Sequence, residues 1–157
     1  MSKVAIGGMI ETRNLVLVHI LGVRRGPGVA GLTLSTLGRA GVNVLCIVSS
    51  PDSRGRENLS VAVEHKDLDQ ALGLLQDLAE RIEAKSIDCR KHVALVSIYG
   101  PHFSERPAIA GMMFEALAAG GIDIHAVSTS VSTVSCIVEE KDLPGAREEI
   151  GRTFLVP

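Results

Sequence analysis

An internal repeat restricts the possible folds of this chain more than any other feature of its sequence. Five residues of the first half recur in the second half at an offset of 80: Pro27, Ala30, Gly31, Leu37 and Gly41 match Pro107, Ala110, Gly111, Leu117 and Gly121. Further along, LSVAVEHKDL at 59–68 recurs as VSCIVEEKDL at 134–143, at an offset of 75. The offset changes at the loop 50–58, where insertions are tolerated, so we interpret the chain as a duplicated structural unit.

Each half predicts the same order of elements: strand, helix, strand, strand, helix. The first half predicts strands at 15–22, 42–49 and 59–64 and helices at 28–40 and 68–83. The second half predicts strands at 93–100, 122–129 and 133–138 and helices at 108–119 and 143–152. Pro27 and Pro107 fit the first turn of a helix, where the missing amide hydrogen is not needed, and Asp67 and Asp142 resemble helix N-caps.

This order predicts an α+β fold of two ferredoxin-like βαββαβ units, each an antiparallel sheet with helices on one face. KSIDCR at 85–90 supplies the last strand of the first unit, which we place at 14–90. The second unit, at 93–157, has no last strand after its second helix. We therefore expect the segment 3–10, which contains VAIGGMI, to complete its sheet as an N-terminal strand, because an unpaired edge favours aggregation.

The composition narrows the classes of partner. Hydrophobic residues make up 46% of the chain and aromatic residues only 3%, so the core is expected to be aliphatic. The net charge is -2 without a basic block, and nucleic acid is not a predicted partner. Leu15–Val23, the longest apolar stretch, is shorter than the roughly 18–20 residues of a membrane span. Cys46, Cys89 and Cys136 are isolated thiols, which indicates a reducing compartment, and we predict a cytoplasmic protein.

Gly26–Gly31 matches G-x-G-x-x-G, the pattern of a dinucleotide-binding turn, and Asp52 follows about 20 residues later. Two observations count against that interpretation: the repeat copy RPAIAG keeps only the last glycine, and the next strand is followed by another strand. The helix start itself predicts a different site. Its unpaired amides and positive dipole end attract carboxylate or phosphate, and Gly28 lets a ligand approach the backbone closely. The alternative is a helix start that packs and binds nothing.

The sequence predicts no catalytic site, metal site or cofactor in this chain. The five histidines, His19, His65, His92, His102 and His125, lie at no metal-ligand spacing from one another or from a cysteine. Glu139–Glu140 and Glu148–Glu149 are predicted to be solvated charges, and no P-loop lysine occurs.

Several stretches carry a family resemblance. GVRRGPGVAGLTLSTLGRAGVNV and, in the second half, MMFEALAAGGIDIHAVSTS resemble the paired ACT domains of aspartate kinase, and the likeness covers about residues 5–154. The resemblance implies a regulatory module in which a free amino acid, threonine, lysine or both, binds between ACT domains. It implies allosteric feedback control of aspartate kinase in lysine, threonine and methionine biosynthesis. The implied partners are a second copy, in a homodimer through ACT–ACT pairing, and a catalytic domain or subunit of aspartate kinase.

The resemblance also implies an effector site. The backbone at Gly28 and Ala30 matches the positions that hold the effector, Asn43 and Asp123 match a polar position beside it, and Ser128–Ser130 matches a polar wall. The full set of predicted effector-binding residues is Arg25, Gly26, Pro27, Gly28, Val29, Ala30, Val42, Asn43, Ser49, Asp123, Ile124, Ser128, Thr129 and Ser130.

Three positions depart from the family pattern. Arg25 stands where family members usually have an Asp that pairs with the ammonium of the effector, Ser49 replaces a Gln, and Val131 replaces a Glu. These changes suggest an altered effector, a weakened site or a purely structural ACT pair. Two alternative functions therefore stay open: a degenerate ACT pair that acts only as a dimerisation scaffold, and a small dinucleotide-binding oxidoreductase.

Overall fold

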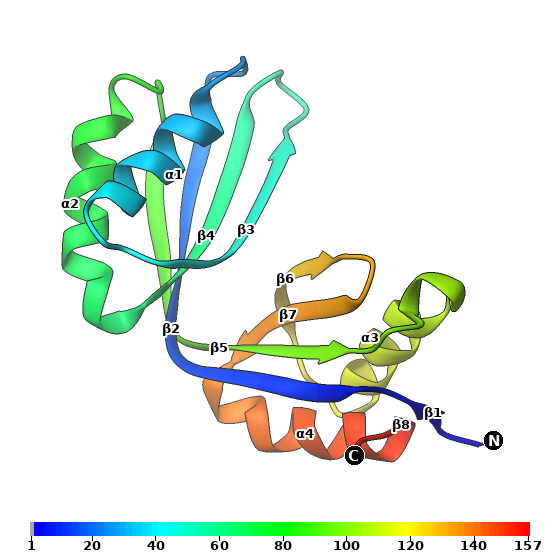
Figure 1. Cartoon of the computed structure of the whole chain (residues 1–157). Helices are drawn as coiled ribbons and strands as arrows, with labels where there is room; N and C mark the ends of the chain where they lie inside the picture. The colour runs from blue at the N-terminus through cyan, green and yellow to red at the C-terminus, as the bar shows by residue number, and fades with distance from the viewer. Residues whose placement is uncertain (1) are drawn as a thin grey trace. The chain divides into compact units, whose positions relative to one another are not determined.

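The computed structural model describes residues 2–157 and has the predicted α+β architecture (Figure 1). The chain divides into two compact units: the first unit is Asn14–Lys91, and the second unit combines the residues up to Arg13 with His92–Pro157. Each unit is a four-stranded sheet that two helices cover on one face. An N-terminal strand that begins at Gly8 completes the sheet of the second unit, as the sequence predicts, whereas Val4–Ala5 of the predicted segment 3–10 pair with Phe154–Leu155 instead.

The first unit has the strand order β3–β4–β2–β5. Its elements are the part of β2 (Gly8–Val23) from Asn14 onward, α1 (Val29–Arg39), β3 (Val44–Pro51), β4 (Glu57–Glu64), the 3-10 turn His65–Asp67, α2 (Leu68–Ala79) and the part of β5 (Ser86–Tyr99) up to Lys91. Strand β4 pairs antiparallel with both neighbours, and Val61 lies opposite Val18 on β2 and Ile47 on β3. These three side chains face α1 and α2.

The second unit has the strand order β2–β5–β7–β6 and a separate parallel pair, β1 with β8. Its further elements are β1 (Val4–Ala5), the 3-10 turn Phe103–Glu105, α3 (Ile109–Ala119), β6 (Ile124–Thr129), β7 (Thr133–Glu139), the 3-10 turn Glu140–Asp142, α4 (Leu143–Thr153) and β8 (Phe154–Leu155). Strand β7 pairs antiparallel with β5 and β6. The short pair β1–β8, absent from the prediction, joins the first and last elements of the chain.

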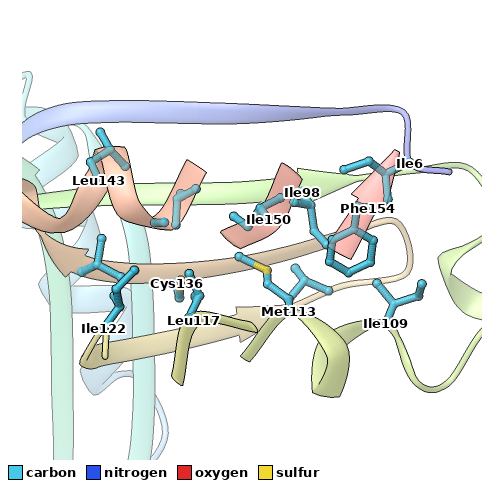
Figure 2. Packing of buried hydrophobic residues seen from close by; sticks show 14 of the residues in the cluster. Ile6, Ile98, Ile109, Met113, Leu117, Ile122, Cys136, Leu143, Ile150 and Phe154 are labelled. Carbon is cyan, nitrogen blue, oxygen red and sulfur yellow. The ribbon is translucent and has the colours of Figure 1, made fainter. Parts of the chain in front are cut away.

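Each unit has its own aliphatic core, and the two cores use matched positions of the repeat. In the first unit Val18, Leu37, Val61 and Leu75 are fully buried. The matched residues of the second unit, Val96, Leu117, Cys136 and Ile150, are fully buried as well, with Phe154 at the end of the core (Figure 2). Cys136 is therefore a packing residue, as free cysteines in cores usually are.

Strands β2 and β5 are longer than predicted. The sequence predicts separate strands at 85–90 and 93–100, and a gap between 4–10 and 15–22, but each pair is one continuous strand. The junction sequences ETRN and CRKH contain neither Gly nor Pro, so nothing in them ends a strand. Both junctions instead contain one left-handed residue, Asn14 and His92, each with φ 58°.

Helices α1 and α3 begin one residue later than predicted, α2 and α4 begin where predicted, and the caps differ from the expectation. Pro27 and Pro107 each lie one residue before the N-cap and so outside the first turn. Asp67 and Asp142 occupy the N-cap positions of α2 and α4 but form no side-chain cap hydrogen bond, because a 3-10 turn leads directly into each helix. In residues 2–157 no helix has both the length and the apolar character needed to cross a membrane.

An ion pair fastens the first part of β2 to α4 in the second unit. The Arg147 guanidinium donates to both carboxylate oxygens of Glu11, at 2.7 Å from Nε to Oε1 and 2.6 Å from Nη2 to Oε2. This hydrogen bonding, together with the positive charge, holds the pKa of Glu11 below its usual range. The Lys3 ammonium donates to the Gly151 carbonyl at 2.6 Å. Residues 3–11 are thus held in place as part of the second unit.

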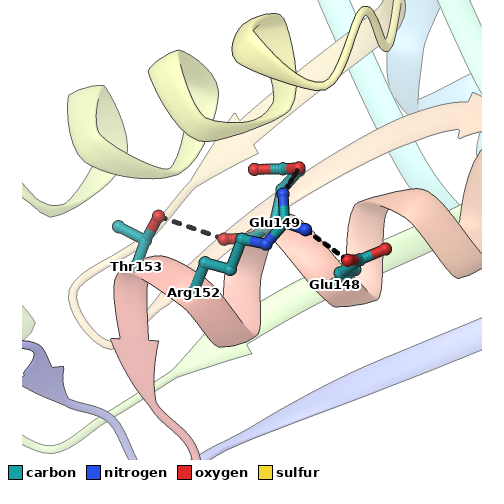
Figure 3. A network of polar contacts seen from close by, with 4 residues as sticks. All are labelled: Glu148, Glu149, Arg152 and Thr153. Carbon is teal, nitrogen blue, oxygen red and sulfur yellow. Dashed lines mark hydrogen bonds and ion pairs between the residues drawn. The ribbon is translucent and has the colours of Figure 1, made fainter.

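The last turns of α4 carry a network of charged side chains (Figure 3). Arg152 pairs with Glu148 and, at 2.7 Å, with Glu149, while the Thr153 hydroxyl donates to the Glu149 carbonyl at 3.0 Å. Both glutamates are in helix ion pairs, spaced four and three residues from Arg152; Glu148 is exposed as predicted, whereas the Glu149 side chain is only 18% exposed and lies beside Gly120.

Candidate functional site

The loop before α1 in the first unit presents an open stretch of backbone. Arg25, Gly26, Pro27, Gly28 and Ala30 are all exposed. Gly28 has φ 95°, a left-handed conformation that favours glycine, and a Cβ at this position would meet nothing within 4 Å. Its carbonyl accepts the first helical hydrogen bond, so the amides of residues 29–31 have no acceptor within the helix. These amides, at the positive end of the helix dipole, can receive a carboxylate.

The two arginines of this loop have different roles. Arg24 Nε donates to the Arg81 carbonyl at 3.3 Å and lies 4.0 Å from Glu83 Oε2. It therefore fastens the loop to the segment after α2. Arg25 is exposed and has no ion-pair partner within residues 2–157. Of the two cations, Arg25 is the one that is available to a ligand.

The remaining predicted residues of the first unit do not all lie near the loop. The side chains of Val29 and Val42 are core residues, 1% and 3% exposed, so only their backbone can meet a ligand. Asn43 follows α1, whose 11 residues span about 16 Å, and it lies at the other end of this helix from Gly28. Ser49 is near the end of β3, which runs back toward the loop (Figure 1).

Glu57 is a candidate residue that sequence reasoning missed. It lies on β4 opposite Val23, the last strand residue before the loop. It shares the helix-facing side of β4 with Leu59, and Ser49 Oγ donates to its Oε1 at 2.6 Å. A carboxylate therefore stands at the loop end of the sheet. The signal in the sequence is weak, because the contact joins residues on different strands across a diagonal.

The predicted residues of the second unit all lie on or beside β6. Asp123 is exposed just before the strand, and Ile124 packs partly against the core opposite Val138. Ser128 and Thr129 are exposed near the other end of the strand. The Ser130 amide donates to the Thr133 carbonyl at 2.8 Å and closes the turn into β7. The hydroxyl row and Asp123 therefore lie at opposite ends of a six-residue strand.

The geometry does not support a dinucleotide site at Gly26–Gly31. The strands of the first unit pair antiparallel, whereas a dinucleotide fold needs a parallel sheet. Asp52 is the acid that such a fold would direct at a ribose. Here Asp52 Oδ1 accepts hydrogen bonds from the backbone amides of Arg56 and Arg54, at 2.9 and 2.7 Å. These hydrogen bonds lower the pKa of Asp52. Asp52 thus shapes the turn between β3 and β4.

Other titratable groups are used within the fold. His19 Nδ1 lies 2.7 Å from Ser60 Oγ, and His125 Nε2 lies 3.2 Å from Glu139 Oε1. Burial raises the pKa of the Cys46 thiol, which makes this group a poor nucleophile at neutral pH. Among residues 2–157, no cluster of three or more His, Cys, Asp or Glu side chains could hold a metal ion.

Comparison with known proteins gives matches in both sequence and fold. A family model described as an ACT domain matches residues 96–154. An aspartate kinase of Stutzerimonas stutzeri (strain A1501) is 34% identical over 154 residues, 98% of this chain and 37% of that protein. An aspartokinase of Pseudomonas aeruginosa shows the same identity and coverage. The chain thus spans little more than a third of the length of these curated relatives.

Solved structures match over nearly the whole of both chains. A chain from the crystal structure of aspartokinase alpha and beta subunits is 30% identical, with a TM-score of 0.86, and the match covers 95% of this chain and 98% of that one. The ligand-free regulatory subunit of aspartate kinase from Thermus thermophilus has the same TM-score at 23% identity, over 96% of this chain and 99% of that chain, and this likeness concerns the fold.

Proposed function

We propose a function that starts from one premise: the chain belongs to the aspartokinase family and forms an ACT-domain regulatory part of it. The function is allosteric feedback control of an aspartate kinase catalytic domain or subunit by a bound free amino acid, in lysine, threonine and methionine biosynthesis. The effector acts by binding one conformation of the module better than another. The observation that carries the proposal is the exposed backbone around Gly28 at the start of α1.

In this proposal the effector's carboxylate binds the amides of residues 29–31. These donors lack helical acceptors, and they lie at the positive end of the α1 dipole. Gly28 supports the contact in two ways: its left-handed φ turns the chain into the helix, and its missing side chain leaves the backbone open to a ligand. The guanidinium of Arg25, which has no ion-pair partner within residues 2–157, adds positive potential for the same carboxylate.

The effector's ammonium needs a negative partner, and we assign that role to Glu57. Arg25 stands where the family pattern has an acid, so the loop itself carries no carboxylate for this purpose. Glu57 lies opposite Val23 at the base of the loop. Its Oε1 accepts a hydrogen bond from the Ser49 hydroxyl. This hydrogen bond orients the carboxylate and leaves Oε2 for an ammonium. Ser49 thus acts as a positioning residue in the proposed site.

Threonine is our first choice of effector and lysine the second. The hydroxyl and methyl groups of threonine need no charged partner. The side-chain ammonium of lysine would require a second carboxylate, because Glu57 is already assigned to the ammonium that both amino acids share.

The proposal includes a homodimer formed by side-by-side ACT pairing and a cytoplasmic location. Strands β3 and β6 each have one hydrogen-bonded neighbour, so each presents an edge to which a second copy can pair. The three cysteines are free thiols, which suits a reducing compartment.

Titration calorimetry with threonine, lysine and the other amino acids tests the effector site. We expect saturable heat with threonine for the wild-type chain and none for Gly28→Asp, because the new carboxylate repels the ligand and occupies its space. Glu57→Gln is expected to weaken binding about tenfold, through loss of the charge-assisted contact with the ammonium. Glu64→Gln, at the other end of β4, is the matched control and is expected to leave the affinity unchanged.

Three other outcomes would redirect the proposal. If no amino acid produces heat, the chain is a dimerisation scaffold, which light scattering would then confirm as a dimer. Unchanged threonine binding by Gly28→Asp would mean that the site has been assigned to the wrong loop. Saturable binding of NAD(P)H, abolished by the same substitution, would favour the oxidoreductase alternative.

A further inference from the structure

The second unit contains a small cavity whose lining includes none of the predicted effector residues. It lies where the N-terminal strand β1 meets the connection between β5 and α3, and its volume is about 130 Å³. Its lining consists of Val4, Ala5, Gly100, Pro101, His102, Phe103 and Arg106. For scale, an apolar protein cavity of roughly 150 Å³ takes up benzene, so this one can hold a group of four to six carbon atoms.

The walls of the cavity are held in place by the backbone around them. The Gly100 amide donates to the Ser132 carbonyl at 2.9 Å, and the Arg106 amide donates to the Phe103 carbonyl at 3.1 Å. The Phe103 side chain is buried, and a Cβ on Gly100 would lie only 2.6 Å from its ring, so this ring packs directly on the Gly100 backbone. On the other side, Val4 packs partly against the core and pairs with Phe154.

Among the residues that line the cavity, Arg106 carries a permanent charge. Arg106 is exposed and has no ion-pair partner within residues 2–157. His102 lines the cavity too, and its Nδ1 lies 3.4 Å from Glu105, which is not part of the lining. No carboxylate occurs among the residues that line the cavity. Apolar walls with one convergent cation favour a ligand that has an apolar body and an acidic end.

We propose that this cavity binds a small aliphatic or aromatic monocarboxylate that carries no ammonium group. The apolar end of the ligand packs between Val4 and Phe103, and its carboxylate pairs with the Arg106 guanidinium. An amino acid of the same size would bring an ammonium that has no acid to meet it, so amino acids are disfavoured. The ligand would contact both β1 and the β5–α3 connection, and its binding would therefore fasten the N-terminal strand.

The test is an NMR titration of the full chain with sodium isovalerate, with sodium chloride at matched ionic strength as the baseline. We expect saturable shifts at the amides of residues 4–6 and 100–106. Arg106→Gln is expected to weaken the binding about tenfold, whereas Arg39→Gln, an exposed arginine in the first unit, leaves it unchanged. Leucine, the amino-acid counterpart of isovalerate, is expected to bind at least tenfold more weakly.

Hydrogen exchange provides a second readout. The Ile6 amide donates to Leu155 and the Gly7 amide to Tyr99, so both report on opening of the N-terminal strand. Isovalerate at ten times its Kd should slow their exchange about tenfold if opening destroys the cavity.

Three results would overturn the proposal: no saturable shift, equal affinity for leucine and isovalerate, or undiminished binding by Arg106→Gln. Gly28→Asp separates this site from the effector loop, because that substitution is expected to abolish threonine binding and to leave isovalerate binding unchanged.

Discussion

The two units have separate cores built from matched residues, but they differ in the loop before their first helix. In the first unit this loop enters α1 through Gly28 in a left-handed conformation, and it leaves the backbone exposed. At the matched position of the second unit, Ala108 has φ -83° in the right-handed region. There the loop instead buries Phe103 against Gly100. The duplication is thus preserved where the helices pack on the sheet and has diverged where the chain can meet a ligand.

A second contrast concerns the strand that completes each sheet. In the second unit Glu11 on β2 pairs with Arg147 on α4. The repeat-matched residues of the first unit are Cys89 on β5 and Leu72 on α2, and both pack against the aliphatic core. The matched strand and helix positions are therefore charged and paired in one unit and apolar in the other.

The largest expected effect tests whether the two cores are equivalent. Leu37→Ala and Leu117→Ala remove matched, fully buried side chains. Each is expected to lower the free energy of unfolding by about 2–5 kcal/mol, because a cavity is left in a close-packed core. Urea denaturation followed by circular dichroism measures both variants. Costs that differ by more than this range would show that one unit carries most of the stability.

The next largest effect compares the loop before α1 with the loop before α3. Gly28→Ala places a side chain at φ 95°, which costs about 1–2 kcal/mol of unfolding free energy even though the surroundings are open. The matched substitution Ala108→Gly, at a right-handed N-cap position, should change the free energy of unfolding by only a few tenths of a kcal/mol, because glycine is the better N-cap but gives the unfolded chain more freedom. Urea denaturation of both variants provides the comparison. Equal costs would mean that the left-handed turn of the first unit is not required.

The ion pair of the second unit has a smaller expected effect. Glu11→Gln should lower the free energy of unfolding by about 1 kcal/mol at pH 7, since Arg147 is half exposed and solvent screens the pair. The double variant Glu11→Leu/Arg147→Leu, which places apolar side chains at both positions as in the first unit, is expected to restore most of that loss. A double variant less stable than Glu11→Gln would contradict the equivalence of the two matched pairs of positions.

The same pair predicts a pH dependence with a definite sign. The folded-state pKa of Glu11 is lowered, so its contribution to stability is fully present above the ordinary carboxyl pKa of about 4.3. That contribution is lost as the pH falls through the lowered folded-state value. Denaturation of wild type and Glu11→Gln between pH 7 and pH 3 should therefore show two stability curves that converge on acidification.

The smallest effect concerns one core position at which the units differ. Thr33 is fully buried on α1, where Met113 is the matched residue of α3. Its hydroxyl donates only to the Val29 carbonyl of its own helix, at 2.9 Å. Thr33→Val is expected to change the free energy of unfolding by less than about 1 kcal/mol, toward greater stability, because an apolar group replaces the hydroxyl. A thermal melt with a clearly lower Tm would indicate a further partner for the hydroxyl.

Most of the fold follows from patterns that the sequence displays directly. The repeat, the apolar runs and the glycines predict the four helices and the antiparallel strands, with the N-terminal strand in the second unit. The sequence does not predict that β2 and β5 continue through both units, because a strand of average length is expected to stop before Asn14 and His92. The two-residue pair β1–β8 is also too short to leave a periodic signal.

The candidate site is harder to predict than the fold. Gly28 is recognisable because glycine before a helix indicates an unusual backbone, and its left-handed φ fits this expectation. The Ser49–Glu57 contact depends on the register of β3 against β4, which the alternation of side chains does not fix by itself. The burial of Phe103 is likewise invisible in the sequence, because a single aromatic residue in a loop resembles an exposed one.

The division of the chain has a consequence for its synthesis on the ribosome. Asn14–Lys91 forms a compact unit of consecutive residues, so that stretch can fold soon after it leaves the exit tunnel. The apolar segment that precedes it must wait for partners that are translated much later: β1 pairs with β8, which lies at the far end of the chain. At about 5–20 residues per second this nascent strand stays unpaired for about 8–30 s, and it is the part of the protein that a cotranslational chaperone would protect.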